Sequence, residues 1–167
     1  MRHINDLAGR ELRWSAANWL GNEYHLRAGG EAAAVVRFHG WMHTRATAHS
    51  GSDCWRFSHD GLLQTRVTIR ACGDDRPVAV FRPSIWGTGG RLELADGRRY
   101  VARANVWMTS YEFTTEDGAP LVRYRLGGML TRSVTFDTQS AATALPELPW
   151  LVTLGWYLTV RQHTDSC

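Results

Sequence analysis

The feature that most constrains the fold is a repeat of about 22 residues that runs through most of the chain. Large apolar residues mark its period at steps of 21 to 23 residues: Trp19, Trp41, Leu63, Trp86, Trp107 and Met129. Residue pairs typical of tight turns recur between them: Gly29-Gly30, Ser50-Gly51, Gly73-Asp74, Asp96-Gly97 and Asp117-Gly118. A unit of this length with a turn near its middle forms two strands and a hairpin. Six such units predict about twelve antiparallel strands.

The segments between the turns alternate apolar and polar residues, as half-buried strands do. Pairing across Asp117-Gly118 sets Glu112 opposite Arg123 and Phe113 opposite Val122, so that charges meet on one face and apolar groups on the other. The hairpin around Asp96-Gly97 behaves alike, with Leu92, Leu94, Tyr100 and Ala102 facing in and Glu93, Arg99 and Arg103 facing out. One inner face per strand predicts a single closed sheet with one interior.

The repeat ends at residues 148–160, which contain no charged side chain. Glu147 precedes this segment, Arg161 follows it and Pro149 stands in its first turn, which is the pattern of a helix. Its apolar residues fall on every side, so the helix must be buried all round or lie in a membrane. At 1.5 Å per residue it covers about 20 Å, short of the roughly 30 Å of a hydrocarbon core. We therefore expect a helix over 146–162 threaded through the sheet, with no transmembrane span; insertion into a membrane is the alternative.

The chain of 167 residues is expected to form one domain: a polar lead segment (1–13, with a short strand near Glu11–Trp14), the hairpin array (14–140) and the helix. All 19 basic residues are arginine, and the net charge is +3. Without lysine there is no Schiff base, no pyridoxal phosphate attachment and no P-loop. Since no catalytic motif stands out either, the sequence predicts a protein that is not an enzyme and carries no cofactor.

Cysteine content and the N-terminus bear on the compartment. Cys54, Cys72 and Cys167 form an odd, widely spaced set without a Cys-x-x-Cys motif, which argues against disulfides and a structural zinc site and fits a reducing compartment. Residues 1–6 lack the apolar core of a secretory signal. We expect a cytoplasmic protein, at most peripheral at a membrane.

The layout as a whole, six hairpins followed by an apolar C-terminal helix, resembles the tubby C-terminal-like superfamily, which includes tubby domains, the plant LURP-one-related proteins and the phospholipid scramblases. The resemblance covers about residues 12–163, and Leu145–Leu151 looks like the approach to the helix in small bacterial members. It implies a β-barrel wrapped round a helix. It also implies lipid or partner binding rather than catalysis.

Outward arginines are the best binding candidates, because two share the outer face of each of three strands: Arg66, Arg70, Arg99, Arg103, Arg123 and Arg125. Guanidinium groups grip phosphate bidentately, so these residues predict a module that recognises anionic, phosphoinositide-like membrane lipid. The alternative is a solvated face balanced by Glu93 and Glu112, which predicts a scaffold for a protein partner. Nucleic-acid binding is not favoured, since no clustered basic stripe with stacking aromatics is visible.

Other patterns point to ordinary structure. His39 and His43 have zinc-ligand spacing but lack a helix, and residues 49–53 hold serine, histidine and an acid in a hairpin turn rather than at a nucleophile elbow. The glycine-rich residues 87–90 lead into a strand, so a bend is expected there. Four tryptophans recur at loop ends: Trp19, Trp41, Trp86 and Trp107. We expect them to plug the barrel ends over the helix, and insertion into a membrane interface is the alternative.

Overall fold

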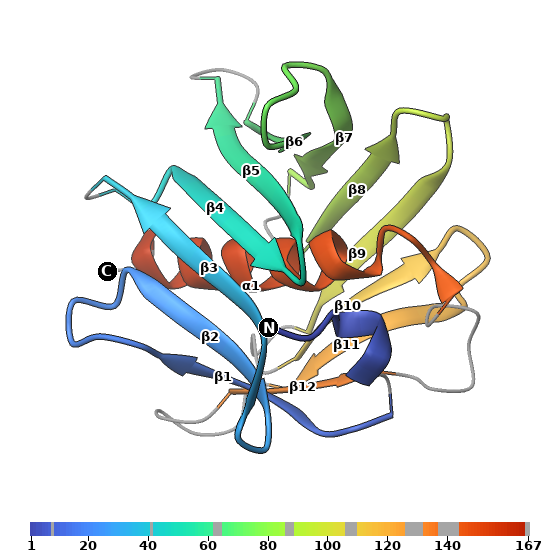
Figure 1. The fold of residues 1–167 in the computed structure, drawn as a ribbon. Helices are drawn as coiled ribbons and strands as arrows, with labels where there is room; N and C mark the ends of the chain where they lie inside the picture. The colour runs from blue at the N-terminus through green and yellow to red at the C-terminus, as the bar shows by residue number, and fades with distance from the viewer. Residues whose placement is uncertain are drawn as a thin grey trace.

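The computed structural model describes residues 1–7, 9–40, 42–61, 65–85, 89–105, 110–125, 132–136 and 144–165. Within them lie a 3-10 turn, η1 (Ile4–Leu7), twelve strands and one helix, α1 (Leu148–Asp165) (Figure 1). The strands are β1 (Leu12–Ala16), β2 (Glu23–Ala28), β3 (Glu31–His39), β4 (Arg45–Ser50), β5 (Asp53–Asp60), β6 (Arg66–Ala71), β7 (Pro77–Pro83), β8 (Gly89–Leu94), β9 (Arg99–Ala104), β10 (Ser110–Thr115), β11 (Pro120–Arg125) and β12 (Arg132–Phe136). An all-β fold with one C-terminal helix is thus confirmed.

The strands form one antiparallel sheet in which neighbours in sequence are neighbours in space. β1 pairs with β2 on one side and with β12 on the other, so the strand order closes into a barrel. Figure 1 shows the strands arranged around α1, which crosses the middle of the view. Closure leaves the strands without free edges, and the sheet has one inner face to fill.

The strand registers expected across the tight turns are confirmed. Glu112 lies opposite Arg123 and Phe113 opposite Val122, as the alternation requires. The inward residues of the β8–β9 hairpin are buried, namely Leu92, Leu94, Tyr100 and Ala102. The turn glycines Gly97 and Gly118 have φ of 89° and 88°, a left-handed conformation that costs other residues energy. Local turn chemistry therefore sets the register of these hairpins.

The interior is filled by α1, whose residues from Leu148 to Val160 are all buried. Trp156 stacks on Trp14 of β1 with ring centroids 5.0 Å apart. The hydroxyl of Tyr124, on β11, donates to the main-chain carbonyl of Val152 at 2.5 Å. These contacts explain the uninterrupted apolar composition of the helix. Within the described residues, no helix is long and apolar enough to cross a membrane.

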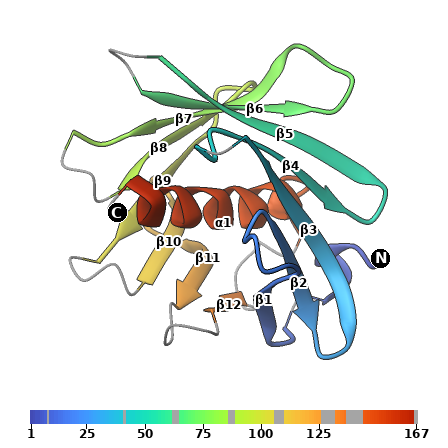
Figure 2. The ribbon, with the colours of Figure 1, turned by 90° about the vertical axis from the view of Figure 1, so that its left-hand side faces the viewer.

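The connections between strands alternate between the two ends of the barrel, because each connection reverses the chain. We call the end with the β2–β3, β4–β5, β6–β7, β8–β9 and β10–β11 connections the turn end, and the end with the β1–β2, β3–β4 and β7–β8 connections the loop end. α1 begins at the turn end, where Glu147 bonds to Arg98, and runs toward the loop end, where Tyr157 donates to the Thr44 carbonyl at 2.7 Å. Figure 2 shows α1 lying along this axis.

Two expectations about the ends of the barrel are wrong. The segment 1–13 is not merely polar, because η1 buries Ile4 and Leu7 completely and the Ser50 hydroxyl accepts a bond from the Ile4 N–H. Trp19 does not plug the barrel: it lies in the β1–β2 connection and its exposed fraction is 93%. α1 already fills the interior, so no space remains there for this side chain. The other repeat markers, Trp41, Leu63, Trp86, Trp107 and Met129, lie outside the described residues.

Candidate anion-binding surface

The six arginines expected to bind a ligand lie on three strands that are not all adjacent. Arg66 and Arg70 are on β6, Arg99 and Arg103 on β9, and Arg123 and Arg125 on β11. Five of them are exposed and Arg70 is half-buried. Two strands separate β6 from β9, and β10 separates β9 from β11. The six residues therefore do not form one cluster.

On β9 to β11, positive and negative side chains alternate. Glu112 of β10 lies opposite Arg103 on one side and Arg123 on the other. Its carboxylate accepts a bond from Arg123 Nε at 3.1 Å. Glu93 of β8 lies opposite Arg99 in the same way. This part of the outer face is a mosaic of paired charges.

On β6 to β8 the arginines meet without an intervening carboxylate. Arg82 of β7 lies directly opposite Arg91 of β8. Val67 lies opposite Phe81, and the next outward residues along those strands are Arg66 and Arg82. Arg82 and Arg91 were not among the arginines predicted to bind a ligand, although the apolar-polar alternation along each strand places both on the outer face.

A groove of about 430 Å³ crosses the outer face of β3 to β6, and three arginines line it: Arg45, Arg56 and Arg70. Ser58, Thr47 and His39 supply further polar groups, and Asp75 supplies the one carboxylate in the lining. The register sets Arg56 directly opposite Arg70 and Arg45 opposite Ser58. With His39 neutral, the lining carries two more positive than negative charges. Of the predicted candidates, only Arg70 belongs to this groove.

Main-chain carbonyls hold the two facing guanidinium groups in place. Arg56 Nη2 donates to the Asp74 carbonyl at 2.8 Å, and Arg70 Nε donates to the Asp75 carbonyl at 2.9 Å. Arg70 Nη1 also donates to the Ser58 hydroxyl at 3.2 Å. Since a guanidinium group has five N–H donors, each arginine keeps donors for a ligand. The Arg45 side chain has no hydrogen-bond or ion-pair partner among the described residues.

Nearby carboxylates neutralise these arginines only weakly. The Asp74 carboxylate accepts a bond from the Arg76 N–H at 2.9 Å, and this bond lowers the pKa of Asp74. Asp75 reaches Arg56 at 3.5 Å, but its side chain is fully exposed, where an ion pair contributes little. Like charges directly opposite each other on a sheet are destabilising. An anion that bridges Arg56 and Arg70 would reduce the electrostatic repulsion between them.

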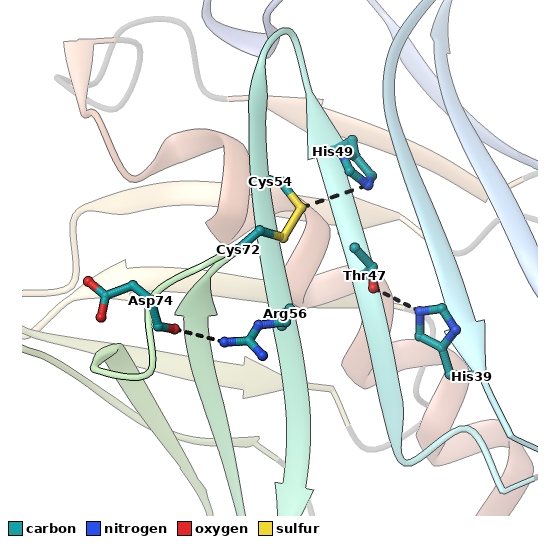
Figure 3. Close-up of a disulfide and its surroundings, with 7 residues drawn as sticks. All are labelled: His39, Thr47, His49, Cys54, Arg56, Cys72 and Asp74. Carbon is teal, nitrogen blue, oxygen red and sulfur yellow. Dashed lines mark hydrogen bonds between the residues drawn. A yellow bond between two sulfur atoms is a disulfide. The ribbon is translucent and has the colours of Figure 1, made fainter.

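A disulfide joins Cys54 to Cys72 beside this groove, so the expectation of unpaired cysteines is wrong (Figure 3). Trp55 of β5 lies opposite Ala71 of β6. Cys54 precedes Trp55 and Cys72 follows Ala71, so the antiparallel register brings the two cysteines face to face. Spacing motifs could not reveal a pair that strand register creates. The bond ties β5 to the turn that carries the Asp74 carbonyl. The cysteine content therefore no longer supports a reducing compartment.

The other chemical patterns do not come together into sites. His39 bonds to the Thr47 hydroxyl at 2.8 Å, and His43 packs edge-on against Phe38. Among the described residues, no three side chains suited to a metal gather. In segment 49–53, Ser50 is buried and donates to the Ala33 carbonyl, whereas Asp53 bonds to His3 at 3.1 Å. Of residues 87–90, Gly89 and Gly90 belong to β8, and the other two lie outside the described residues.

A second cleft, of about 530 Å³, lies at the turn end, next to the start of α1. Arg98 Nη1 and the Tyr100 hydroxyl both donate to the buried Glu147 carboxylate, each at 2.5 Å. Burial, and then the bond to Glu147, raises the pKa of Tyr100. Bonds to Asp96 and Glu147 raise the pKa of Arg98. These polar groups satisfy one another, so the cluster holds the helix to the β8–β9 turn rather than offering donors to a ligand.

Comparison with known proteins adds a fold relationship. No protein-family model and no curated protein matches the chain. The chain is similar to the X-ray structure of a protein from Arabidopsis thaliana, with a TM-score of 0.59 and 10% sequence identity over 96% of each chain. At this identity the likeness establishes a shared fold and nothing about function.

Proposed function

We propose that this protein is a non-enzymatic binding domain that recognises the phosphate of an anionic membrane lipid through arginines on the outside of its barrel. The groove formed by Arg45, Arg56 and Arg70 carries the proposal. Its guanidinium groups converge from three adjacent strands, and two of them are pre-oriented by main-chain carbonyls. Charge-assisted bonds from such groups suit the tetrahedral, doubly charged phosphomonoester. A peripheral position at a membrane follows from this function.

The architecture of the barrel supports binding at its surface and also suggests the family to which the chain belongs. The interior is taken up by α1, so a ligand must bind to the outer face or an end. Twelve strands paired in a closed order around a buried helix support our further proposal that the chain is a member of the tubby C-terminal-like superfamily. Within the described residues, the polar groups of the cleft at the turn end bond mainly to each other, and the groove on β3 to β6 carries mainly positive charge. Both features favour binding over catalysis.

A protein-interaction scaffold is the second candidate function. The alternating charges of Arg103, Glu112 and Arg123 favour it, because paired charges on a rigid sheet complement another protein better than a uniformly anionic surface. The two functions predict different partners and different salt dependence.

Vesicle co-sedimentation tests the proposal with neutral phosphatidylcholine vesicles and with vesicles that also contain phosphatidic acid, at low and high salt. We expect binding to the anionic vesicles alone, lost at high salt. Arg45→Ala, Arg56→Ala and Arg70→Ala should each weaken it about fivefold, since an arginine near such a surface contributes about 1 kcal/mol.

Arg123→Ala is the matched control, because Arg123 is also on the outer face but is paired with Glu112 at 3.1 Å, away from the groove. It should change binding little. Arg99→Ala combined with Arg103→Ala tests the arginines of β9 and should have less effect than the groove variants. If the protein fails to bind anionic vesicles even at low salt, the lipid proposal falls and the scaffold function stands.

A further inference from the structure

Apolar side chains are exposed at the loop end of the barrel. Among the described residues, the large hydrophobic side chains that are exposed are Met1 and four residues of the loop end: Trp19 (93%), Leu20 (60%), Met42 (54%) and Ile85 (100%). They come from three separate connections, β1–β2, β3–β4 and β7–β8. We call these four exposed side chains of the loop end the apolar tips.

The turn end has the opposite character. Of the exposed large hydrophobic side chains of the described residues, Met1 alone lies near this end, where the neighbouring Arg2 N–H donates to the Ala32 carbonyl at 3.3 Å. Those connections and the strand ends beside them instead carry seven acidic residues: Glu31, Asp53, Asp74, Asp75, Asp96, Glu116 and Asp117. Arginines at this end offset these charges: Arg76 and Arg98 are ion-paired to Asp74 and Asp96, and Arg2 and Arg10 both pair with Glu31. Arg27, Arg70 and Arg99 also lie at strand ends on this side. The charges of the turn end are therefore largely balanced by one another.

Arginines surround the loop end. Arg45 and Arg66 are the first residues of β4 and β6, and Arg82 is the last but one of β7. All three are exposed, and none has an ion-pair partner among the described residues. The acids flanking this end are already engaged: Glu23 bonds to Arg37 and His25, and Asp60 accepts bonds from Ser58 and Thr68. Charge is therefore polarised along the barrel axis, with the positive side at the apolar tips.

We infer that the loop end is the membrane-facing surface of the protein. Trp19, Leu20, Met42 and Ile85 enter the interfacial layer of an anionic bilayer, and the surrounding arginines contact lipid phosphates. Tryptophan and other apolar side chains partition favourably into that layer. The negative surface potential of the bilayer also turns the positive end of the protein toward the membrane. This inference rests on the proposed function and adds the orientation of the bound protein.

The groove opens at the same end of the barrel as the apolar tips. Arg45 and His39 lie at the β3–β4 connection, so the groove begins at the loop end and runs down the barrel wall. A phosphate that projects from the bilayer would meet Arg45 first and then reach Arg56 and Arg70. Insertion of the tips therefore brings the groove to the height of the headgroups.

Site-specific fluorescence tests the orientation. In a Cys167→Ser background with the Cys54–Cys72 disulfide intact, Ile85→Cys and Leu20→Cys would carry an environment-sensitive NBD label, and Asp117→Cys would carry it at the turn end. With vesicles of phosphatidylcholine and phosphatidic acid, we expect the emission at positions 85 and 20 to rise at least twofold and shift to the blue. The label at 117 should not respond.

An added negative charge gives an independent readout. Ile85→Glu should weaken co-sedimentation with these vesicles about tenfold, since it removes an inserted apolar group and adds repulsion. Ala119→Glu makes the same change in charge at the exposed turn end and is the matched control. Both positions are exposed, so the fold should be unaffected.

Three outcomes would overturn the inference. If the protein sediments with anionic vesicles while the labels at 85 and 20 stay silent, the orientation is wrong and the lipid proposal survives. If the label at 117 responds as strongly, the protein lies on its side or has no fixed orientation. If no variant and not even the wild type sediments with vesicles, both proposals fall, and the exposed tips are better explained as contacts for a protein partner.

Discussion

Replacing Tyr111 by phenylalanine should stabilise the protein, whereas the same replacement at Tyr124 should destabilise it. The two residues make a matched pair, because both are almost completely buried and their rings lie 6.2 Å apart, edge to face, on neighbouring strands. They differ in what the hydroxyl contacts. Tyr124 donates to the Val152 carbonyl of α1, whereas the Tyr111 hydroxyl has no partner among the residues that the structure describes.

The magnitudes follow from that difference. A buried hydroxyl without a partner costs about 1–3 kcal/mol, so Tyr111→Phe should gain about 1 kcal/mol or more. Tyr124→Phe loses one hydrogen bond to the helix, a net loss of about 1 kcal/mol. For 167 residues the entropy of unfolding is roughly 0.35 kcal/mol/K, so 1 kcal/mol corresponds to about 3 °C in Tm. The two variants should therefore melt about 6 °C apart.

Thermal and urea unfolding at neutral pH, under non-reducing conditions, measure both effects. Alkaline pH adds a second readout, because burial raises the pKa of both tyrosines above the ordinary value of about 10. Above that value the unfolded chain ionises and the folded protein does not, so stability falls as pH rises, by about 1.4 kcal/mol per pH unit for each tyrosine. Either replacement should make this fall shallower. A Tyr111→Phe variant that melts below the wild type would show that its hydroxyl is bonded and refute the reasoning.

Two further changes test the packing of the helix and the disulfide. A Cβ on Gly155 would overlap the ring of Tyr124. Gly155→Ala should therefore lower the free energy of unfolding in urea by about 1–2 kcal/mol, because overpacking outweighs the helix propensity of alanine. A variant more stable than the wild type would contradict this contact. Replacing both Cys54 and Cys72 by serine opens a loop of 18 residues and should lower the free energy of unfolding by about 3 kcal/mol. The double variant should also bind anionic vesicles more weakly, because the turn that orients Arg56 is no longer tied to β5. Unchanged stability would contradict a formed disulfide.

Strand register explains what the sequence could and could not predict. Across the short turns at Gly97 and Gly118, turn type and alternation determine the register, so the facing of Glu112 and Arg123 was predicted. β5 and β6 are joined instead by a longer connection at the loop end, which sets no register by itself. Both the disulfide and the facing of Arg56 and Arg70 arise across that junction, and both were missed.

The polarity of the two ends has a similar explanation. Aspartate recurs at the turn end because its side chain supports tight turns, as Asp96 does by accepting the Arg98 N–H at 3.0 Å. The turn chemistry that revealed the hairpins thus also gathers carboxylates at one end of the barrel. Individual hairpins do not show this, since the ends become surfaces only when all strands close around the helix. Trp19 was misassigned for the same reason: its repeat position marks a loop but not the direction of its side chain.

The way charges are placed on the outer face argues that the groove is functional. On β8 to β11 opposite charges face each other, as at Glu112 and Arg123. At Arg56 and Arg70 it sets two positive charges opposite each other and fixes both with main-chain carbonyls. Selection for stability alone would favour a carboxylate at one of these positions. The carboxylate that reaches this pair, that of Asp75, is fully exposed and neutralises it only weakly. Because local rules are most often broken where a protein does its work, we explain the facing arginines by an anion that binds there.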